Sequence, residues 1–299
     1  MMQENRAPRD EAHDTSPESV PVAVPEAANT VWPSMTDWDL VLPPSRPSRD
    51  HLNFINNALS RIGRNSPVAV LGATPEYRDL LAENDFSEIV LFDRNPGFVR
   101  KMTSLRVYSN TETLIEGDWR DTLRNYHNEF GAILSDYTSG NIPYDDRRDF
   151  YADISQALAY GGVFIDRHLR HRIQKLLPLA DVITYYQNAP LNLAEINRFN
   201  CEVLFRSELL IGREIVDSTE IYEFLDHTYM AMPRILSFAK QSQRVTPRGG
   251  IWWYGRDWPA LRSDYCPALE PIQTLREPRY SPYHGIGLCM ALRREKPDE

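Results

Sequence analysis

The chain has 299 residues, a formal net charge of −9 and no apolar run long enough to predict a membrane-spanning helix. The excess of negative charge argues against a nucleic-acid partner, because binding to phosphates would begin with repulsion. Cys201, Cys266 and Cys289 lie far apart, which predicts neither a disulfide framework nor a zinc site. We therefore expect a cytoplasmic protein with no metal and no membrane partner.

The first 66 residues differ in composition from the rest of the chain. Residues 1–30 carry six acidic and two arginine side chains and almost no bulky apolar residues, so they are predicted to be a disordered tail. Residues 31–66 are expected to be a linker and a docking helix, the helix over about residues 50–62. Aromatic residues there, such as Trp32 and Trp38, either fold over a ligand or dock onto the core.

The most informative segment is VAVLGATPE at residues 68–76. Its first four residues are apolar, which predicts a buried parallel strand. Gly72 marks a turn where a ligand can approach the backbone. Thr74 is a favourable N-cap, and Pro75 suits the first position of a helix over residues 75–83. A strand, a glycine turn and a helix N-terminus form the ligand crevice of an open α/β sheet.

A second strand is predicted at residues 88–92, and it ends in Asp93, 21 residues after Gly72. An acidic residue at that distance, at the tip of the second strand, is where the hydroxyl pair of a ribose is bound. This spacing predicts an adenosine-containing ligand. The alternative is that Asp93 only opens the turn before Pro96.

The glycine turn lacks the G-x-G-x-x-G pattern of dinucleotide sites. Thr74, Pro75 and Glu76 occupy the positions that should admit a phosphate. The Glu76 carboxylate would repel a pyrophosphate and would suit a cationic group such as a sulfonium. This favours S-adenosylmethionine over NAD as the cofactor.

Three further strands continue the alternation with helices, which predicts a parallel sheet. They are expected at residues 112–115, at 131–135, and at 162–165 after a helix over about 147–160 and a turn at 160–162. Asp118 and Trp119 follow the third strand. An aspartate there can accept a hydrogen bond from an adenine amino group, and an indole can cover the ring. An ordinary turn with a buried aromatic residue is the alternative.

Together these segments resemble the class I S-adenosylmethionine-dependent methyltransferases. The resemblance rests on VAVLGATPEYRDL, LFDRNP, LIEGDWRDTL, FGAILSDY and GGVFIDRHL, and narrows to a variant with G-A-T-P-E in the first motif and G-D-W in the third. It implies an α/β fold: a Rossmann-like seven-stranded methyltransferase sheet, mostly parallel with an antiparallel last strand, with helices on both faces and a helical cap insertion.

The resemblance also implies a role for each matched residue in the first two motifs. Gly72, Ala73 and Thr74 would approach the methionine part of the cofactor. Asp93 would bind the ribose, and Arg94, which follows it in the same motif, is counted with the cofactor-binding residues.

In the later motifs, the resemblance places Asp118 and Trp119 at the adenine. It implies that Ser135 and Asp136, at the end of the fourth strand, line the floor near the sulfonium.

The rest of the chain is expected to complete the sheet and to cover its ligand edge. Residues 67–168 form the cofactor-binding core, and residues 169–249, with apolar residues at helical spacing, form a helical cap. In the C-terminal part, residues 250–299, the segments 251–254 and 258–261 are expected as the sixth strand region and its helix. Residues 286–292 are expected as the antiparallel seventh strand.

Asp136, Tyr137 and His168 are the candidate catalytic residues. The enzyme needs chiefly to align an acceptor with the methyl carbon, and a base helps only for an alcohol, a phenol or a carbon acid. His168 and Asp136 are candidate bases, and the ring of Tyr137 could face a sulfonium; ordinary packing is the alternative for each. An aromatic-rich stretch could wall an apolar acceptor; its members are Trp252, Trp253, Tyr254, Tyr280 and Tyr283.

The sequence therefore predicts an S-adenosylmethionine-dependent methyltransferase that acts on a small-molecule acceptor, with secondary metabolism as the expected setting. One alternative keeps the cofactor but attacks another carbon of the sulfonium, by cyclisation or by 3-amino-3-carboxypropyl transfer, and releases methylthioadenosine. A ligand sensor or interaction protein is a third hypothesis, and an NAD-linked oxidoreductase a fourth. The sequence predicts neither the acceptor nor the oligomeric state.

Overall fold

The computed structural model describes residues 38–43, 45–169, 176–253, 258–265, 267–276 and 287–294. The predicted disordered tail, Trp32, Tyr254, Cys266, Tyr280 and Tyr283 lie outside the described residues. Within the described ranges, no helix is both long and apolar enough to cross a membrane.

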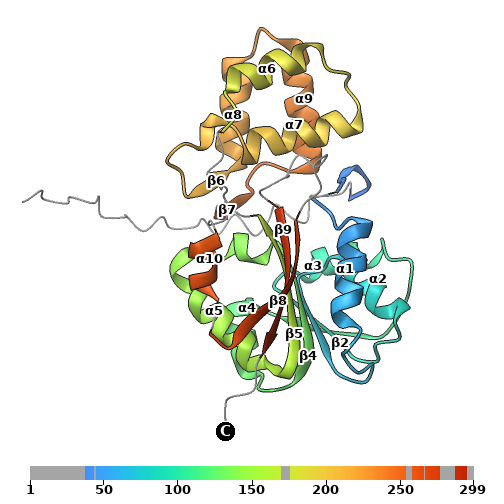
Figure 1. Ribbon diagram of the computed structural model, residues 1–299. Helices are drawn as coiled ribbons and strands as arrows, with labels where there is room; N and C mark the ends of the chain where they lie inside the picture. Colours follow the sequence, from blue (N-terminus) through green and yellow to red (C-terminus); the bar gives the residue numbers. More distant parts are fainter. Residues whose placement is uncertain are drawn as a thin grey trace, which may run out of the picture.

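A seven-stranded sheet forms the centre of the molecule, with the strand order β3-β2-β1-β4-β5-β9-β8 (Figure 1). Strands β1 to β5 pair in parallel, and β9 runs antiparallel to both β5 and β8. The predicted Rossmann-like sheet with an antiparallel last strand is thus confirmed. Its strands are β1 (Val68–Leu71), β2 (Ile89–Asp93), β3 (Glu112–Glu116), β4 (Phe130–Asp136), β5 (Leu158–Leu169), β8 (Leu269–Arg276) and β9 (Gly287–Arg294).

The prediction of the sixth strand was wrong. Strand β7 (Ile251–Trp253) pairs with β6 (Ile215–Asp217) in a separate two-stranded sheet. The edge of the main sheet is β8 instead, a strand of mixed polarity whose pairing shifts register between Pro271 and Gln273. A proline at a bulge is compatible with an edge strand but weakens the sequence pattern from which a strand is predicted.

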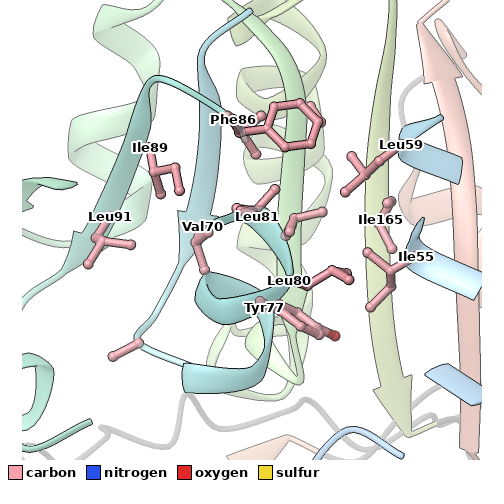
Figure 2. Close-up of a cluster of buried hydrophobic side chains, with 14 of the residues drawn as sticks. Ile55, Leu59, Val70, Tyr77, Leu80, Leu81, Phe86, Ile89, Leu91 and Ile165 are labelled. Carbon is pink, nitrogen blue, oxygen red and sulfur yellow. The ribbon is translucent and has the colours of Figure 1, made fainter. Parts of the chain in front are cut away.

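Helices cover both faces of the sheet. On one face lie α1 (Arg49–Leu59), α2 (Pro75–Glu83) and α3 (Pro96–Thr103), and on the other lie α4 (Trp119–Thr122), α5 (Tyr144–Ala157) and α10 (Trp258–Asp264) (Figure 1). Figure 2 shows the first of these cores, in which side chains of α1 and α2 such as Leu59 and Leu81 pack over strand residues such as Val70 and Ile165. Strands β1 and β2 are buried on both faces, as their apolar sequences predict.

The expected turn at residues 160–162 lies within β5, which begins as soon as α5 ends. The pairing of β4 with β5 shifts register between Phe130 and Ala132. A Cβ atom on Gly162 would lie 2.7 Å from the Ala159 carbonyl oxygen, so only glycine fits this irregularity. The glycines therefore mark a bulge inside a strand.

A group of four helices lies beyond the carboxyl ends of the parallel strands, with β6 and β7 between it and the sheet (Figure 1). These helices share an apolar core of their own, which includes Tyr186, Phe199 and Phe238. They are α6 (Leu179–Asn188), α7 (Leu193–Phe205), α8 (Ser218–Thr228) and α9 (Pro233–Val245). Short 3-10 helices complete the described elements: η3 (Trp38–Leu40), η4 (Leu123–Asn125), η5 (Thr138–Asn141) and η6 (Glu208–Leu210).

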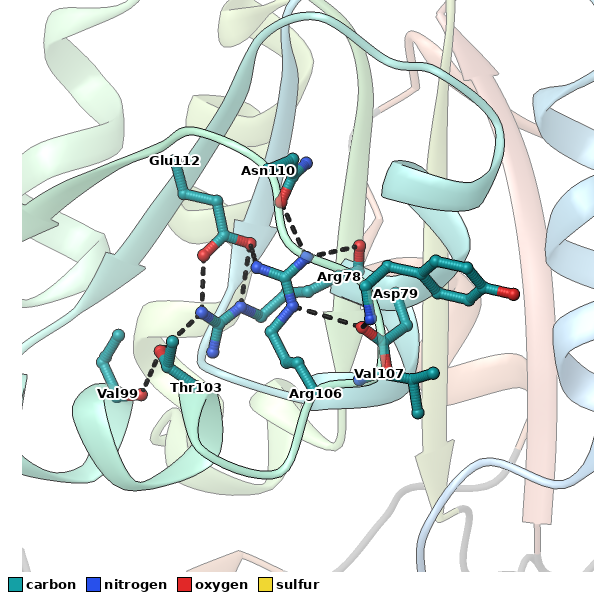
Figure 3. A network of polar contacts seen from close by, with 9 residues as sticks. Arg78, Asp79, Val99, Thr103, Arg106, Val107, Asn110 and Glu112 are labelled. Carbon is teal, nitrogen blue, oxygen red and sulfur yellow. Dashed lines mark hydrogen bonds and ion pairs between the residues drawn. The ribbon is translucent and has the colours of Figure 1, made fainter.

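A buried network of charges fixes α2 to the edge of the sheet (Figure 3). Arg78 donates to Glu112 at the start of β3 from both Nε (3.0 Å) and Nη2 (2.5 Å). Arg106 lies 2.8 Å from the same carboxylate and 3.3 Å from Asp79. The arginine side chains are almost fully buried, so breaking these ion pairs would leave buried charges without partners. The pairs therefore hold α2 in place against β3.

Candidate ligand-binding site

A cavity of ≈ 260 Å³ opens at the carboxyl ends of the parallel strands. It is lined by the turns that follow β1, β2, β3 and β4, and is closed from the other side by residues before α1 and by the helical group with β6 and β7. We call its part at the ends of β2 and β3 the polar half, with Asp93, Arg94, Asn95, Asp118 and Trp119. We call its part around η5 and β7 the aromatic half, with Phe205, Val216, Trp252 and Trp253.

The glycine turn lies between the two halves. Gly72 has a φ of 98°, and a Cβ atom there would meet nothing within 4 Å, so the backbone is open to a ligand. Helix α2 begins at Pro75, as predicted. Thr74 does not cap this helix with its side chain, however, because its hydroxyl donates to Asp136 Oδ2 at 2.9 Å. Thr74, the N-cap residue of α2, therefore joins the end of β1 to the end of β4 through this hydrogen bond.

Asp93 lies at the tip of β2, where the sequence places it. Its Oδ1 accepts a hydrogen bond from the backbone N–H of Asn95 at 2.8 Å, and the residue is only 8% exposed. Burial raises the pKa of Asp93 to about 6, against the weaker opposing effects of Asn95 and Arg94. A carboxylate that has lost water in this way gains from a ligand with hydroxyl donors. Arg94 is half exposed, with Nη1 3.9 Å from Asp118 Oδ2.

Asp118 and Trp119 follow β3 and face the same half of the cavity. Burial raises the pKa of Asp118, but the hydrogen bonds and charge of Arg120 outweigh this and leave the pKa below its usual value. The indole N–H of Trp119 donates to the Phe92 carbonyl at 2.6 Å, which fixes the ring against β2. The polar half thus combines two carboxylates with one immobilised aromatic ring.

Alternation along β4 and β5 separates the other predicted site residues onto two faces of the sheet. Asp136 and Arg167 pair in register on one face, with Nη2 2.6 Å and Nε 2.7 Å from Asp136 Oδ1. Since Thr74 occupies Oδ2, both oxygens of the candidate base Asp136 are engaged. Tyr137 lines the cavity with a φ of 56°, and the Arg167 guanidinium lies 4.3 Å from its ring centroid. One face of the Tyr137 ring is therefore already covered by a cation.

Ser135 and His168 lie on the opposite face and do not line the cavity. The Ser135 hydroxyl donates to Asp166 Oδ1 at 3.0 Å, and His168 Nδ1 lies 3.2 Å from Asp166 Oδ2. Tyr151 and Tyr265 donate to the same carboxylate, and all of these groups are buried. The expected places of Ser135 near the sulfonium and of His168 as a base are therefore corrected, because the period of two along a strand turns both side chains into the core.

The expected role of Glu76 also needs correction, because this carboxylate does not line the cavity. It accepts a hydrogen bond from the Trp38 indole at 3.0 Å and pairs with Arg46 at 2.5 Å. Its charge therefore gives no preference for a cationic ligand. Instead it anchors the segment before α1, of which Trp38 and Val41 line the cavity. Asn197 of α7 holds the same segment through its backbone.

The sequence analysis missed several lining residues. Phe205 and Val216 come from the helical group and β6, where nothing in the local sequence distinguishes them from core residues. Arg167 does not line the cavity, but its place inside an apolar strand indicates that it needs a charged partner, which is Asp136. In the part of the chain that the structure describes, no three His, Cys, Asp or Glu side chains are grouped so as to hold a metal.

No family model and no curated protein matches the sequence. Solved structures match the fold. A Rhodobacter sphaeroides protein described as a Zn-dependent alcohol dehydrogenase has a TM-score of 0.54 at 13% identity, over 90% of this chain and 98% of that chain. The N-methyltransferase NodS from Bradyrhizobium japonicum WM9, in complex with S-adenosyl-L-homocysteine, has a TM-score of 0.52 at 11% identity, over 90% and 99%.

A third similar structure is 1,6-didemethyltoxoflavin-N1-methyltransferase from Burkholderia thailandensis, with 1,6-didemethyltoxoflavin and S-adenosylhomocysteine bound. Its TM-score is 0.51 at 11% identity, over 94% of this chain and 95% of that chain. At such identities the likeness shows the fold, which is the class I fold of S-adenosylmethionine-dependent methyltransferases. Two of the three similar structures hold the demethylated form of that cofactor.

Proposed function

We propose that this protein is an S-adenosylmethionine-dependent methyltransferase that acts on a small molecule. The observation that carries the proposal is the buried carboxylate of Asp93, at the tip of β2 and in the same cavity as the open glycine turn. Support comes from the two methyltransferases of the same fold that were crystallised with S-adenosylhomocysteine.

The residues of the polar half fit this cofactor. Asp93, desolvated and with a raised pKa, would accept hydrogen bonds from both ribose hydroxyls. Asp118 would accept from the adenine amino group, and the fixed indole of Trp119 would cover the ring. The methionyl chain would pass along Gly72, where no Cβ obstructs it. When bound, the cofactor supplies an electrophilic methyl carbon on a cationic sulfur, which leaves with the bonding electron pair as a neutral thioether.

The chain's own residues position the reaction and exclude water from it. Trp38 and the helical group close the cavity over the sheet. Among the described lining residues there is no His, Lys, Cys or Glu, and Asp136 is occupied by Arg167 and Thr74. The other lining carboxylates, Asp93 and Asp118, lie in the polar half with the cofactor, so an acceptor in the aromatic half that must first lose a proton finds no free base beside it. An amine or a ring nitrogen with an available lone pair suits this site, and the two methyltransferases described above act on nitrogen according to their names.

A product assay tests the proposal. The protein would be incubated with S-adenosylmethionine labelled in the methyl group and with fractions of a small-molecule extract. We expect S-adenosylhomocysteine and a methyl-labelled small molecule to form in equal amounts. Release of methylthioadenosine instead would contradict methyl transfer and would support attack on another carbon of the sulfonium.

A further inference from the structure

One cation among the described residues that line the cavity has no carboxylate partner. The lining cations are Arg94 and Arg147. Arg94 belongs to the polar half, with Nη1 3.9 Å from Asp118 Oδ2. Arg147 is 1% exposed and donates only to backbone carbonyls, from Nε to Ile142 at 3.1 Å and from Nη2 to Ser139 at 2.8 Å. Buried charges in proteins are normally paired, so a lining guanidinium without a counter-ion indicates a site for an anionic group of a ligand.

The acidic residues around Arg147 do not neutralise it. Asp146 precedes it in α5 and pairs with an arginine of α4 at 2.7 Å, while Asp145 is exposed to solvent. Asp136, which lines the same cavity, already has a buried arginine partner on β5. No carboxylate of the described residues therefore forms an ion pair with Arg147.

The third nitrogen of the Arg147 guanidinium is available to a ligand. Nη1 has no hydrogen bond among the described residues, and unlike Nη1 of Arg78 it is not one of the fully buried atoms without a partner. It therefore keeps some exposed surface on a side chain that lines the cavity. The two carbonyls already fix the guanidinium, so an anion can bind to Nη1 without a further cost of ordering this side chain.

Aromatic rings lie along the same segment of the chain. Arg147 binds η5 through the Ser139 carbonyl, and a Cβ atom on Gly140, the next residue, would lie 3.8 Å from Trp252 Cδ1. The ring of Phe205 packs edge-on against Trp252, with centroids 5.8 Å apart. The guanidinium and the indole thus lie against neighbouring residues of η5, within reach of one ligand that carries both a ring and an acidic group.

We propose that the aromatic half binds an acceptor with one carboxylate on an aromatic ring, the carboxylate at Nη1 of Arg147 and the ring against Trp252. That this ligand is the acceptor rests on the proposed function, but the preference for an anion does not. A carboxylate matches a single guanidinium. A phosphate dianion would bring a second charge, and the described lining residues of this half supply no second cation for it. A cationic ligand would meet the charge of Arg147 and be rejected.

Three probes on one ring system test this preference: 2-naphthoate, 2-naphthamide and 2-(aminomethyl)naphthalene, which at neutral pH carry a negative charge, no charge and a positive charge. Each would be titrated by calorimetry into the protein saturated with S-adenosylhomocysteine. We expect 2-naphthoate to bind at least about tenfold more tightly than the amide, and the amine to bind most weakly. Equal or tighter binding of the amide or the amine, or no binding of 2-naphthoate, would overturn the inference.

Variants of Arg147 test its role. Arg147→Gln removes the charge and should reduce the preference for 2-naphthoate over 2-naphthamide from about tenfold to about twofold or less. The ratio of the two affinities is the readout, because a shift of η5 would weaken both probes alike. Arg147→Lys keeps the charge and should retain most of the preference. Arg148→Gln, at the exposed neighbouring position of α5, is the matched control and should change nothing. An unchanged ratio in Arg147→Gln would contradict the role of Arg147.

The cofactor also carries a carboxylate, so its affinity is measured in the same variants. We expect Arg147→Gln to change the affinity for S-adenosylhomocysteine by less than about twofold. A loss as large as that for 2-naphthoate would assign the charge of Arg147 to the cofactor and overturn the inference.

Titrations of the probes without S-adenosylhomocysteine separate the two proposals. If the protein fails to bind S-adenosylhomocysteine but still prefers 2-naphthoate, the proposed function is contradicted and the preference of the aromatic half stands. If it binds S-adenosylhomocysteine but prefers the amide or the amine, the proposed function stands and this inference fails.

Discussion

The two halves of the cavity are built in different ways. In the polar half, Asp93 ends β2 and Asp118 comes two residues after β3, so a short stretch of sequence sets both their identity and their place. In the aromatic half, Phe205 and Trp252 come from segments 47 residues apart (252 − 205) and meet only because the helical group folds over the sheet. Local sequence therefore determines the polar half, whereas tertiary packing determines the aromatic half. We therefore expect the two halves to respond separately to mutation.

The largest effect is expected beneath the polar half, where the Arg78 network fixes α2 to β3. Arg78→Met should lower the free energy of unfolding by about 3 kcal/mol, because it removes a bidentate partner from the buried Glu112 carboxylate. Chemical denaturation measures this change. Arg124→Met, which removes a half-exposed arginine paired with an exposed aspartate, is the control and should cost less than about 0.5 kcal/mol. Similar losses in both variants would show that the network contributes little.

The next largest effect is expected on the cofactor. Asp93→Ala should weaken binding of S-adenosylhomocysteine by about 100-fold, because two ribose hydroxyls lose a charged acceptor. Calorimetry measures this affinity, with Asp121→Ala at a largely exposed position as the control. An unchanged affinity in Asp93→Ala would contradict the ribose site in the polar half.

The reverse selectivity is expected for the aromatic half. Trp252→Ala should slow methyl transfer by about tenfold through loss of ring contact with the acceptor, and should leave S-adenosylhomocysteine affinity within about twofold. Because Trp252 also packs against the helical group, Trp252→Phe is included to retain an aromatic ring. Phe224→Ala, at an exposed aromatic residue, serves as the control. If Trp252→Ala affects mainly the cofactor, the aromatic half has been misplaced.

The smallest effect is a pH dependence that arises from Asp93. Its pKa of about 6 in the free protein is above that of an unfolded aspartate, so its contribution to folding stability is lost as the pH rises through 6. Cofactor binding has the opposite sign, because ribose donors favour the ionised carboxylate. Affinity should therefore be constant above about pH 6 and fall below it, by up to about tenfold per pH unit. In Asp93→Asn the affinity should not depend on pH over this range.

How far the sequence could predict the molecule follows the same division. The strand β1, the helix α2 and the position of Asp93 were predicted correctly because apolar runs, a glycine and a proline determine them locally. Ser135 and His168 were misplaced because the facing of a strand residue depends on register, and a bulge at Gly162 alters the register. The partner of Glu76 could not be predicted, since Arg46 reaches it from a segment 30 residues away (76 − 46).

The edge strand β8 and the short sheet of β6 and β7 were missed for a related reason. Two tryptophans and an isoleucine in β7 have the composition of a central strand, but three residues can pair equally well outside the main sheet. Strand β8 mixes polar and apolar residues without regular alternation and contains Pro271, so its pairing is decided by β9 rather than by its own sequence.

The most direct measurement is a calorimetric titration of the protein with S-adenosylmethionine, with NAD as the control ligand. The glycine turn and Asp93 are compatible with an adenosine moiety in either molecule, and Glu76 no longer decides between them. We expect saturable binding of S-adenosylmethionine at one site and none of NAD. Binding of NAD, or of neither ligand, would contradict the assignment of the polar half and with it the proposed methyltransferase.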